Sequence, residues 1–349
     1  MLLKQKQEQS NGRSATSTHV DVRFRSYSGE EDIASIAEIT QRSFDTQGIE
    51  CLWSKEEAAR TFAYLDHFNP FKDVLLAEAA GDVVAFVRVH WRQEDPGPRI
   101  YHHIGHVLPQ WQHNGIGNLL LQFAQKRLRT LAKHHRHNGS RFFQTWITDS
   151  DTTSKTMLES DGYQPTRYDF DMLRPLTDQI EPRTLPPGLE VRPIQPQDYR
   201  LVWEANDEAF RDHWGYSPAS ESAYEWWQKS DSFQPDLWKV AWDGDQVAGM
   251  ILNFIDHTEN QRYGRKCGYT ENISVRRPWR RRGLARALLT QSLLMLKEKG
   301  LQEARLGVDT QNPNGALQLY ESVGFKSIKR YTTYRKEIHW VTAAGMAQG

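Results

Sequence analysis

The sequence has few cysteines, no long apolar run and no excess of charge of either sign. Its two cysteines, Cys51 and Cys267, lie far apart and form no CxxC pair, which argues against a disulfide framework and a zinc knuckle. No apolar run approaches the ~20 residues needed to cross a bilayer. Lysine plus arginine and aspartate plus glutamate each number 44, so no basic excess indicates nucleic acid. These absences predict a cytoplasmic protein without a membrane or nucleic-acid partner.

Three segments of the first half recur in the second half, in the same order and at a nearly constant offset. Residues 24–27 resemble 191–194, residues 75–85 resemble 238–248, and residues 107–117 resemble 275–285. In a chain longer than one typical domain of roughly 100 to 200 residues, such a repeat predicts two copies of one unit. Residues 174–188 hold four prolines and end in glycine, so they are predicted to link the copies.

The predicted organisation has five parts. They are a disordered lead-in (1–20), copy one (21–173), a proline-rich linker (174–188), copy two (189–340) and a flexible tail (341–349). Each copy reads as a strand, one or two helices, a hairpin, a longer strand, a loop, a helix, a strand, a helix and a last strand. That order predicts an α/β fold with a mixed sheet in each copy.

A glycine-containing loop, Arg280-Arg281-Arg282-Gly283-Leu284-Ala285, precedes an amphipathic helix in copy two. Backbone N–H groups at a helix start favour phosphate, and the small residues Gly283 and Ala285 would let a pyrophosphate approach the backbone. The loop lacks the Gly-Lys-Ser/Thr ending of a Walker A motif. An ordinary strand-to-helix turn with solvated arginines is the alternative interpretation.

The wider pattern resembles the acyl-CoA signature of the GNAT acyltransferase superfamily. The loop follows Ile273-Ser274-Val275 and precedes Asn312 and the run LYESVGF at residues 319–325, and the resemblance covers about residues 188 to 338. It implies acetyl-CoA as co-substrate, with the strand beside the pantetheine and the loop on the pyrophosphate. The implied contacts in copy two are Ile273, Ser274, Val275, Arg280, Arg281, Arg282, Gly283, Leu284, Ala285, Arg286 and Asn312. Asn314 competes with Asn312, because the interval from Asn312 to Tyr320 is one residue longer than in many members.

Two residues of copy two match the acid and the base that this resemblance implies. Tyr320 aligns with the tyrosine that protonates the departing CoA thiolate, and anchoring of the last helix is the alternative. Glu271 lies on the strand that ends near Val275, where a carboxylate with a raised pKa can accept a proton from an attacking amine. Period-two alternation places Glu271 and Val275 on one face, and a plain surface glutamate is the alternative.

Aromatic residues between the first strand and the hairpin of copy two suit an acceptor of mixed polarity. The candidates for substrate contact are Phe210, His213, Trp214 and Tyr216. Simple core packing explains most of them equally well, so both interpretations stand.

Copy one keeps the loop but not the catalytic pair. Gln112, Gly115 and Gly117 satisfy the pyrophosphate-loop pattern and are further candidates for cofactor contact. Alignment of the copies puts Leu158 opposite Tyr320, and the constant offset puts His103 opposite Glu271. Copy one is therefore predicted to be degenerate in catalysis, with CoA binding still open to it.

The predicted function is acetyl transfer from acetyl-CoA to a primary amine of a small molecule or peptide by direct attack. No metal is predicted, because the histidines at positions 134, 135 and 137 have poor ligand spacing for a helical face. A catalytically silent acyl-CoA-binding sensor or scaffold is the alternative. The tandem arrangement is similar to that of the mycothiol synthase family, which pairs a degenerate N-terminal domain with an active C-terminal domain. Fold does not define substrate, so that family's acceptor is not carried across.

Overall fold

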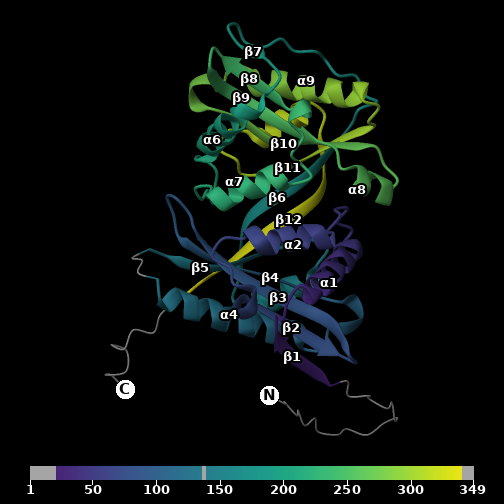
Figure 1. The fold of residues 1–349 in the computed structure, drawn as a ribbon, viewed down its shortest axis with the longest axis vertical. Helices are drawn as coiled ribbons and strands as arrows, with labels where there is room; N and C mark the ends of the chain where they lie inside the picture. The colour runs from purple at the N-terminus through teal and green to yellow at the C-terminus, as the bar shows by residue number, and fades with distance from the viewer. Residues whose placement is uncertain (1–20, 136–138, 340–349) are drawn as a thin grey trace.

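The computed structural model describes residues 21–135 and 139–339 of the chain. The predicted lead-in over residues 1–20 and the predicted tail over 341–349 lie outside these described residues. The described part forms two lobes that share one continuous β-sheet (Figure 1). Among its helices, none is both long enough and apolar enough to cross a membrane.

The two copies have the same order of strands, and each copy has one short α-helix that the other lacks. Copy one contains β1 (Val22–Ser26), α1 (Glu31–Gln47), α2 (Lys55–Tyr64), α3 (Pro70–Asp73), β2 (Val74–Ala79), β3 (Asp82–Gln93), β4 (Arg99–Val107), α4 (Ile116–Lys133), β5 (Arg141–Thr148), α5 (Thr152–Ser160) and β6 (Gln164–Pro175). The second half contains β7 (Glu190–Val191), α6 (Tyr199–Phe210), α7 (Glu221–Lys229), β8 (Lys239–Asp243), β9 (Gln246–Phe254), α8 (His257–Arg262), β10 (Cys267–Val275), α9 (Leu284–Glu298), β11 (Glu303–Asp309), α10 (Ala316–Ser322) and β12 (Lys326–Glu337).

The sheet has twelve strands in the order β1-β2-β3-β4-β5-β12-β6-β11-β10-β9-β8-β7. Strands β4 and β5 pair in parallel, as do β10 and β11, and each of these two connections carries a long helix, α4 or α9. The other pairings are antiparallel. The predicted α/β class with a mixed sheet is confirmed.

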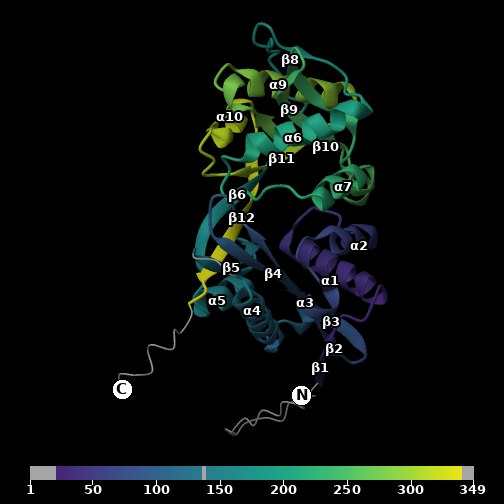
Figure 2. The same ribbon diagram turned by 60° about the vertical axis from the view of Figure 1, so that its left-hand side comes forward.

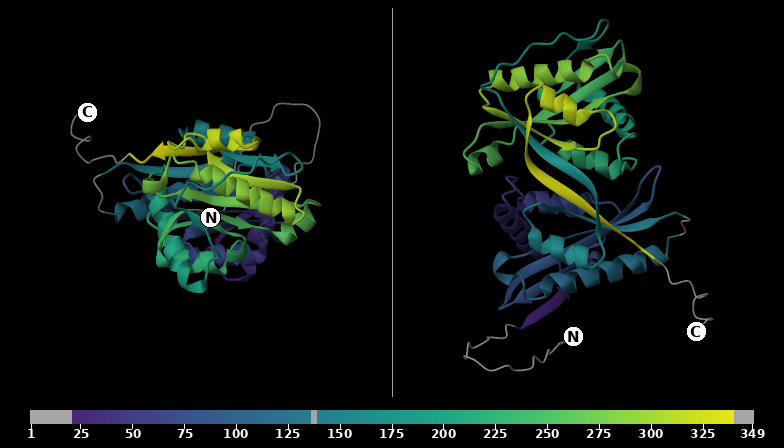
Figure 3. Two further views of the ribbon diagram at one scale, coloured as in Figure 1. Left: turned by 90° about the horizontal axis from the view of Figure 1, so that it is seen from above. Right: turned by 180° about the vertical axis from the view of Figure 1, so that it is seen from behind.

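The last strand of each copy is exchanged between the lobes. Strand β6, from copy one, pairs with β11 of copy two, and β12, from copy two, pairs with β5 of copy one. The two exchanged strands also pair with each other, from Lys326 opposite Leu173 to Arg335 opposite Gln164. Figure 3 shows them as long teal and yellow strands that run together from one lobe to the other. Neither lobe therefore completes its sheet with its own last strand.

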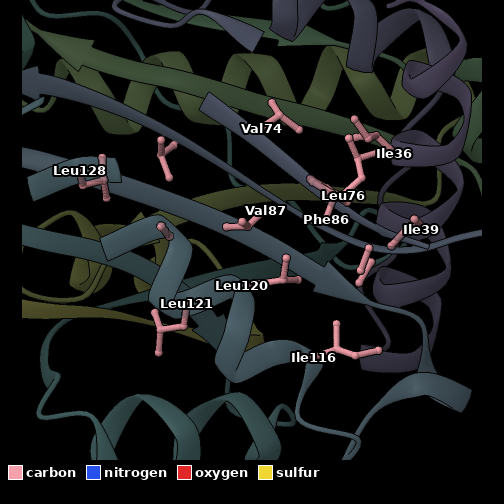
Figure 4. Close-up of a cluster of buried hydrophobic side chains, with 14 of the residues drawn as sticks. Ile36, Ile39, Val74, Leu76, Phe86, Val87, Ile116, Leu120, Leu121 and Leu128 are labelled. Atoms are coloured by element: carbon pink, nitrogen blue, oxygen red, sulfur yellow. The ribbon is translucent and has the colours of Figure 1, made fainter. Parts of the chain in front are cut away.

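Each hydrophobic core includes side chains from the strand that the other copy contributes. Ile36 and Ile39 of α1 and Leu120 of α4 pack on opposite faces of the copy-one sheet (Figure 4), and this core also takes in Tyr334 of β12. In the second lobe, Met172 of β6 is fully buried among side chains of α9 and β11. The sequence could not show this, because an exchanged strand has the same pattern of apolar residues as one that stays in its own lobe.

The segment predicted as a linker is packed rather than extended into solvent. Its first residues continue β6 to Pro175, and Leu176 donates its backbone N–H to Gln302 at 2.8 Å. Leu176 and Ile180 are buried in the core of the second lobe. These contacts hold the start of copy two against α9 and β11.

We expect truncation of an exchanged side chain to destabilise the lobe that receives it. Met172→Ala should lower the free energy of unfolding by about 2 to 5 kcal/mol, because a fully buried side chain leaves a cavity. The control is Leu201→Ala, since Leu201 is 40% exposed on α6. Chemical denaturation measures both, and equal small losses in the two variants would contradict the packing described here.

Candidate active site

Strands β10 and β11 separate partway along their length. Their parallel register runs only from Cys267 opposite Glu303 to Tyr269 opposite Arg305. Beyond that point lies a cavity of about 300 Å³, which we call the splay cavity. Of the residues predicted to contact the cofactor in copy two, it is lined by Ile273, Ser274, Val275, Arg280, Arg281, Gly283, Leu284, Ala285, Arg286 and Asn312. Arg282 is exposed and lies outside this lining.

A β-bulge in β10 turns Glu271 away from this cavity. Glu271 pairs with Leu252 and Val275 pairs with Gly249, so one extra residue of β10 lies between the two pairs, and Asn272 there has φ 48°. Because Leu252 and Gly249 are an odd number of residues apart, the side chains of Glu271 and Val275 face opposite sides of the sheet. The alternation that predicted one shared face is therefore wrong at this strand. Glu271 faces the side of α6 and α7, whereas Val275 packs on the side of α9.

The loop before α9 has an open backbone. Arg281 has φ 60° and Gly283, the N-terminal cap of α9, has φ 84°, both in the left-handed region. No atom lies within 4 Å of the position that a Cβ of Gly283 would occupy. The backbone at this helix start is therefore open to close approach, as an anion bound at a helix N-terminus requires.

Two of the nearby arginines, Arg277 and Arg280, are held by contacts within the protein. The Arg280 guanidinium donates to the carbonyl oxygens of Val275 (2.9 Å) and Ala209 (3.0 Å) and to the carboxylate of Asp212. Arg277 also binds Asp212, and these two arginines hold the pKa of that carboxyl well below its usual range. Arg281, at the mouth of the splay cavity, has no ion pair among the described residues.

Tyr320, on α10, lines the same cavity and is almost fully buried. No hydrogen bond joins its hydroxyl group to another of the described residues. Burial, followed by the nearby carboxylate of Glu271, raises the pKa of Tyr320 above its usual value, so the phenol stays protonated at neutral pH.

Glu271 lines a second and larger cavity of about 1320 Å³, which we call the inter-copy cavity because both copies form its walls. The carboxylate accepts a hydrogen bond from the backbone N–H of Gly307 at 3.1 Å. Burial raises the pKa of Glu271 from 4.5 to about 7, and Asp171 adds to the rise. A carboxylate with this pKa can accept a proton near neutral pH.

A sequence profile of the acetyltransferase (GNAT) family matches residues 33–143 and 199–325. The chain belongs to the GNAT family, with one match in each copy. This membership supports acyl transfer as its activity class, and the co-substrate used by that family is acetyl-CoA.

Individual proteins also resemble this chain over most of its length. A mycothiol acetyltransferase from Thermobifida fusca is 27% identical over 235 residues, which is 63% of this chain and 69% of the relative. A solved GCN5-related N-acetyltransferase from Sphaerobacter thermophilus is 26% identical, with a TM-score of 0.69, over 91% of this chain and 96% of that chain. A tandem GNAT protein from the clavulanic acid biosynthesis pathway covers 92% of this chain and 100% of its own, with 13% identity and a TM-score of 0.61. This last similarity supports the tandem fold alone.

In this GNAT protein, the four residues predicted to contact the acceptor lie in different environments. His213 lines the splay cavity, where its Nε2 lies 3.5 Å from Nδ2 of Asn312, and Phe210 packs against the His213 ring. The guanidinium groups of Arg335 and Arg167 lie 4.1 Å and 5.3 Å from the centre of the Trp214 ring. The Tyr216 hydroxyl donates to Asp207 at 2.8 Å. None of the four predicted residues lines the inter-copy cavity.

Asn312 and Asn314 both line the splay cavity, so the choice between them stays open. The side-chain oxygen of Asn312 accepts the backbone N–H of Asn314 at 2.8 Å, which fixes the turn before α10.

Sequence reasoning missed most of the inter-copy cavity. Trp53 lies in the loop before α2 of copy one, and Glu56 lies at the start of α2. Asp171 comes from the exchanged β6, and Tyr331 comes from β12. Figure 2 shows α7 facing α2 across the boundary between the lobes. No local signal marks these residues, because they meet only after the strands have been exchanged.

Copy one has the same loop conformation without the bulge. His113 has φ 62° and Gly115 has φ 79°, which match the values at Arg281 and Gly283. Gln112 and Gly117 line a cavity of only about 130 Å³, and the Met157 sulfur lies 3.4 Å from where a Cβ of Gly117 would stand.

The β3–β4 register of copy one runs unbroken from Ala85 opposite Val107 to Gln93 opposite Arg99. In this ladder Arg88 pairs with Ile104, as Leu252 pairs with Glu271 in copy two, so Ile104 takes the position of Glu271. The constant offset had indicated His103, which is wrong because the bulge adds one residue to copy two.

His103 has a structural environment instead. Its Nε2 is 2.8 Å from the Tyr163 hydroxyl, and burial lowers the pKa of His103 to about 4. Leu158, the predicted counterpart of Tyr320, is buried in the wall of the small cavity. No group of three or more histidine, cysteine, aspartate or glutamate side chains in the described part of the chain is placed to hold a metal ion.

The raised pKa of Glu271 predicts a cost to stability. Burial favours the protonated form, so the folded state loses stability as pH rises from the unfolded value of 4.5 through about 7. We expect Glu271→Gln to raise the free energy of unfolding by about 1 to 3 kcal/mol at pH 8 and to change it little at pH 4. Denaturant titration at both pH values measures this.

The control variant is Glu298→Gln, since Glu298 is exposed at the end of α9. A difference between Glu271→Gln and wild type that is the same at both pH values would contradict the raised pKa.

Proposed function

We propose that copy two transfers an acetyl group from acetyl-CoA to a primary amine of a small molecule or peptide by direct attack. The observation that supports this best is the position of Tyr320 and Glu271. They reach the gap between β10 and β11 from opposite faces of the sheet, one in the splay cavity and the other in the inter-copy cavity.

The splay cavity fits an acyl-CoA. The open backbone at Gly283 suits the pyrophosphate, and Arg281 supplies a positive charge at the entrance. The unpaired edge of β10 from Ile273 to Val275 offers backbone groups to the pantetheine arm and to the acyl carbonyl. When bound there, acetyl-CoA supplies an activated thioester.

The inter-copy cavity fits the acceptor. Glu271 accepts a proton from the amine as its nitrogen attacks the thioester carbonyl carbon. The carbon–sulfur bond breaks, and Tyr320 donates its phenolic proton to the departing thiolate. The products are the acetamide and CoA thiol, and the proton on Glu271 returns to Tyr320 through solvent.

A covalent route through Cys267 has no support. The Cys267 thiol is buried, and burial raises its pKa to about 12, so it is not a thiolate at neutral pH. Direct attack needs no such nucleophile.

Copy one fits the alternative function, a silent acyl-CoA-binding module. It keeps the left-handed loop at His113 and Gly115 but has Leu158 and Ile104 where copy two has the acid and the base. We propose that copy one has no acetyl transfer of its own, so at most two acetyl-CoA molecules bind per chain and only one reacts.

Tyr320→Phe should lower turnover by roughly 10²- to 10⁴-fold if the proton donor is lost, while acetyl-CoA affinity and fold are kept. Release of free thiol from acetyl-CoA in the presence of a panel of amines measures turnover. Tyr199→Phe is the matched control, because Tyr199 packs on Phe233 far along α6 from the cavity. Wild-type turnover in Tyr320→Phe, with chemistry rate-limiting, would remove Tyr320 as the acid.

The pH profile tests the base independently. Glu271 must be ionised to accept a proton, so kcat/KM of the wild type should rise with pH through about 7. In Glu271→Gln this rise should disappear, and activity should follow only the pKa of the amine itself. An unchanged rise near pH 7 in the variant would assign the base to another group.

A further inference from the structure

The walls of the inter-copy cavity are strongly acidic. Eight carboxylate side chains line it, against three from lysine and arginine. The whole chain has equal numbers of acidic and basic residues, so this excess is specific to the cavity. A cavity with an excess of one charge and low-dielectric walls concentrates ligands of the opposite charge.

The arginines of the cavity are already neutralised by protein carboxylates. Arg60 forms ion pairs with Glu57 at 3.3 Å and with Asp231 at 3.1 Å. Arg305 pairs with Glu50 at 2.7 Å and is also held by Glu303. The lysine, Lys329, donates to the backbone carbonyl of Gln47 at 2.7 Å.

Four other carboxylates in the walls have no ion pair with a described lysine, arginine or histidine. Asp171 accepts a hydrogen bond from the Tyr331 hydroxyl at 2.6 Å, and Asp256 caps α8 by accepting the Glu259 backbone N–H at 2.7 Å. The other two are Glu56, which is exposed on α2, and Glu271. These four carboxylates are therefore not engaged in ion pairs within the described part of the protein and are available to a cationic ligand.

Aromatic rings in the cavity walls also favour a cationic ligand. Trp53, Trp226 and Tyr269 also line the cavity. Indole and phenol faces attract ammonium groups through the ring quadrupole, with tryptophan the most favourable. Carboxylates and aromatic faces together suit an organic cation.

We propose that the acceptor is a small molecule with at least two ammonium groups, a diamine or polyamine. One amine reaches Glu271 and is acetylated, while a second stays protonated and is held by carboxylates such as Glu56 and Asp256. This inference rests on the proposed function, since it names the substrate class of the same site.

Copy one contributes to this recognition although it has lost its own acid and base. Glu56 lies on α2 of copy one, and Asp171 lies on the exchanged strand β6. The degenerate copy thus forms part of the acceptor site of the other.

Three four-carbon amines that differ only in their second end group test the proposal. They are 1,4-diaminobutane, n-butylamine and 4-aminobutanoate, each assayed by thiol release from acetyl-CoA with the full chain. We expect kcat/KM to be at least tenfold higher for the diamine than for butylamine, and lowest for the anionic aminobutanoate. The preference should weaken as ionic strength rises, because salt screens the interaction.

Variants that remove negative charge test which carboxylates cause the preference for the diamine. The double variant Glu56→Gln/Asp256→Asn keeps side-chain shape, and asparagine still caps α8. It should reduce the diamine-to-butylamine ratio of kcat/KM at least threefold, mainly through KM of the diamine. Glu298→Gln, an exposed carboxylate on α9 outside the cavity, should leave the ratio unchanged.

The outcomes separate this inference from the proposed function. If butylamine or aminobutanoate reacts as well as the diamine, transfer stands and the inference fails. If calorimetry shows the diamine binding more tightly than butylamine in the presence of CoA but none of the three amines is acetylated, the cavity chemistry stands and the proposed function fails. If the diamine neither binds more tightly nor reacts faster than butylamine, the inference is overturned.

Discussion

The antiparallel pairing of β6 with β12 holds the whole molecule together. These two strands carry the sheet from one lobe into the other, and each completes the core of the lobe opposite its own copy. Their exchange fixes how the copies meet, so the loop between α1 and α2 of copy one lies over the sheet of copy two. The inter-copy cavity is a consequence of this topology and does not exist in either copy alone.

Within copy two, the bulge at Asn272 directs the residues of one strand to two different cavities. Ile273 to Val275 stay at the splay cavity, while Glu271 turns toward the other face. Gly249 permits this geometry, since a Cβ there would lie 2.8 Å from the Ser274 carbonyl oxygen. Copy one has Ala85 at the matching position and an unbroken ladder. The copies thus differ in the strand beside the loop more than in the loop itself.

The sequence predicted the repeat, the mixed α/β fold and the loop before α9, because these depend on local order and on patterns repeated in both copies. It also grouped Tyr320 and Asn312 with the loop residues in one predicted site, and the structure places these residues, Arg282 excepted, in the lining of the splay cavity. It failed where a single residue changes register, since the bulge moved Glu271 off the face of Val275 and put Ile104, not His103, in the matching place. Alignment of the copies gave no signal for that bulge, because it pairs Ala85 with Ala248, and only the strand register shows that Gly249 takes the place of Ala85. The cavity residues Trp53 and Asp171 were beyond sequence reasoning, because their proximity depends on a long-range strand exchange.

The two loops have matching backbone conformations, whereas we propose chemistry for copy two alone. Gly283→Val and Gly115→Val form a matched pair, because both glycines cap a helix with φ near 80° and neither has an atom within 4 Å of a Cβ. The strain of valine in that conformation is therefore similar at both sites. Turnover of acetyl-CoA with an amine acceptor, measured on folded samples of each variant, should be lost in Gly283→Val and retained in Gly115→Val. Loss of turnover in Gly115→Val, with Gly283→Val still active, would contradict the account.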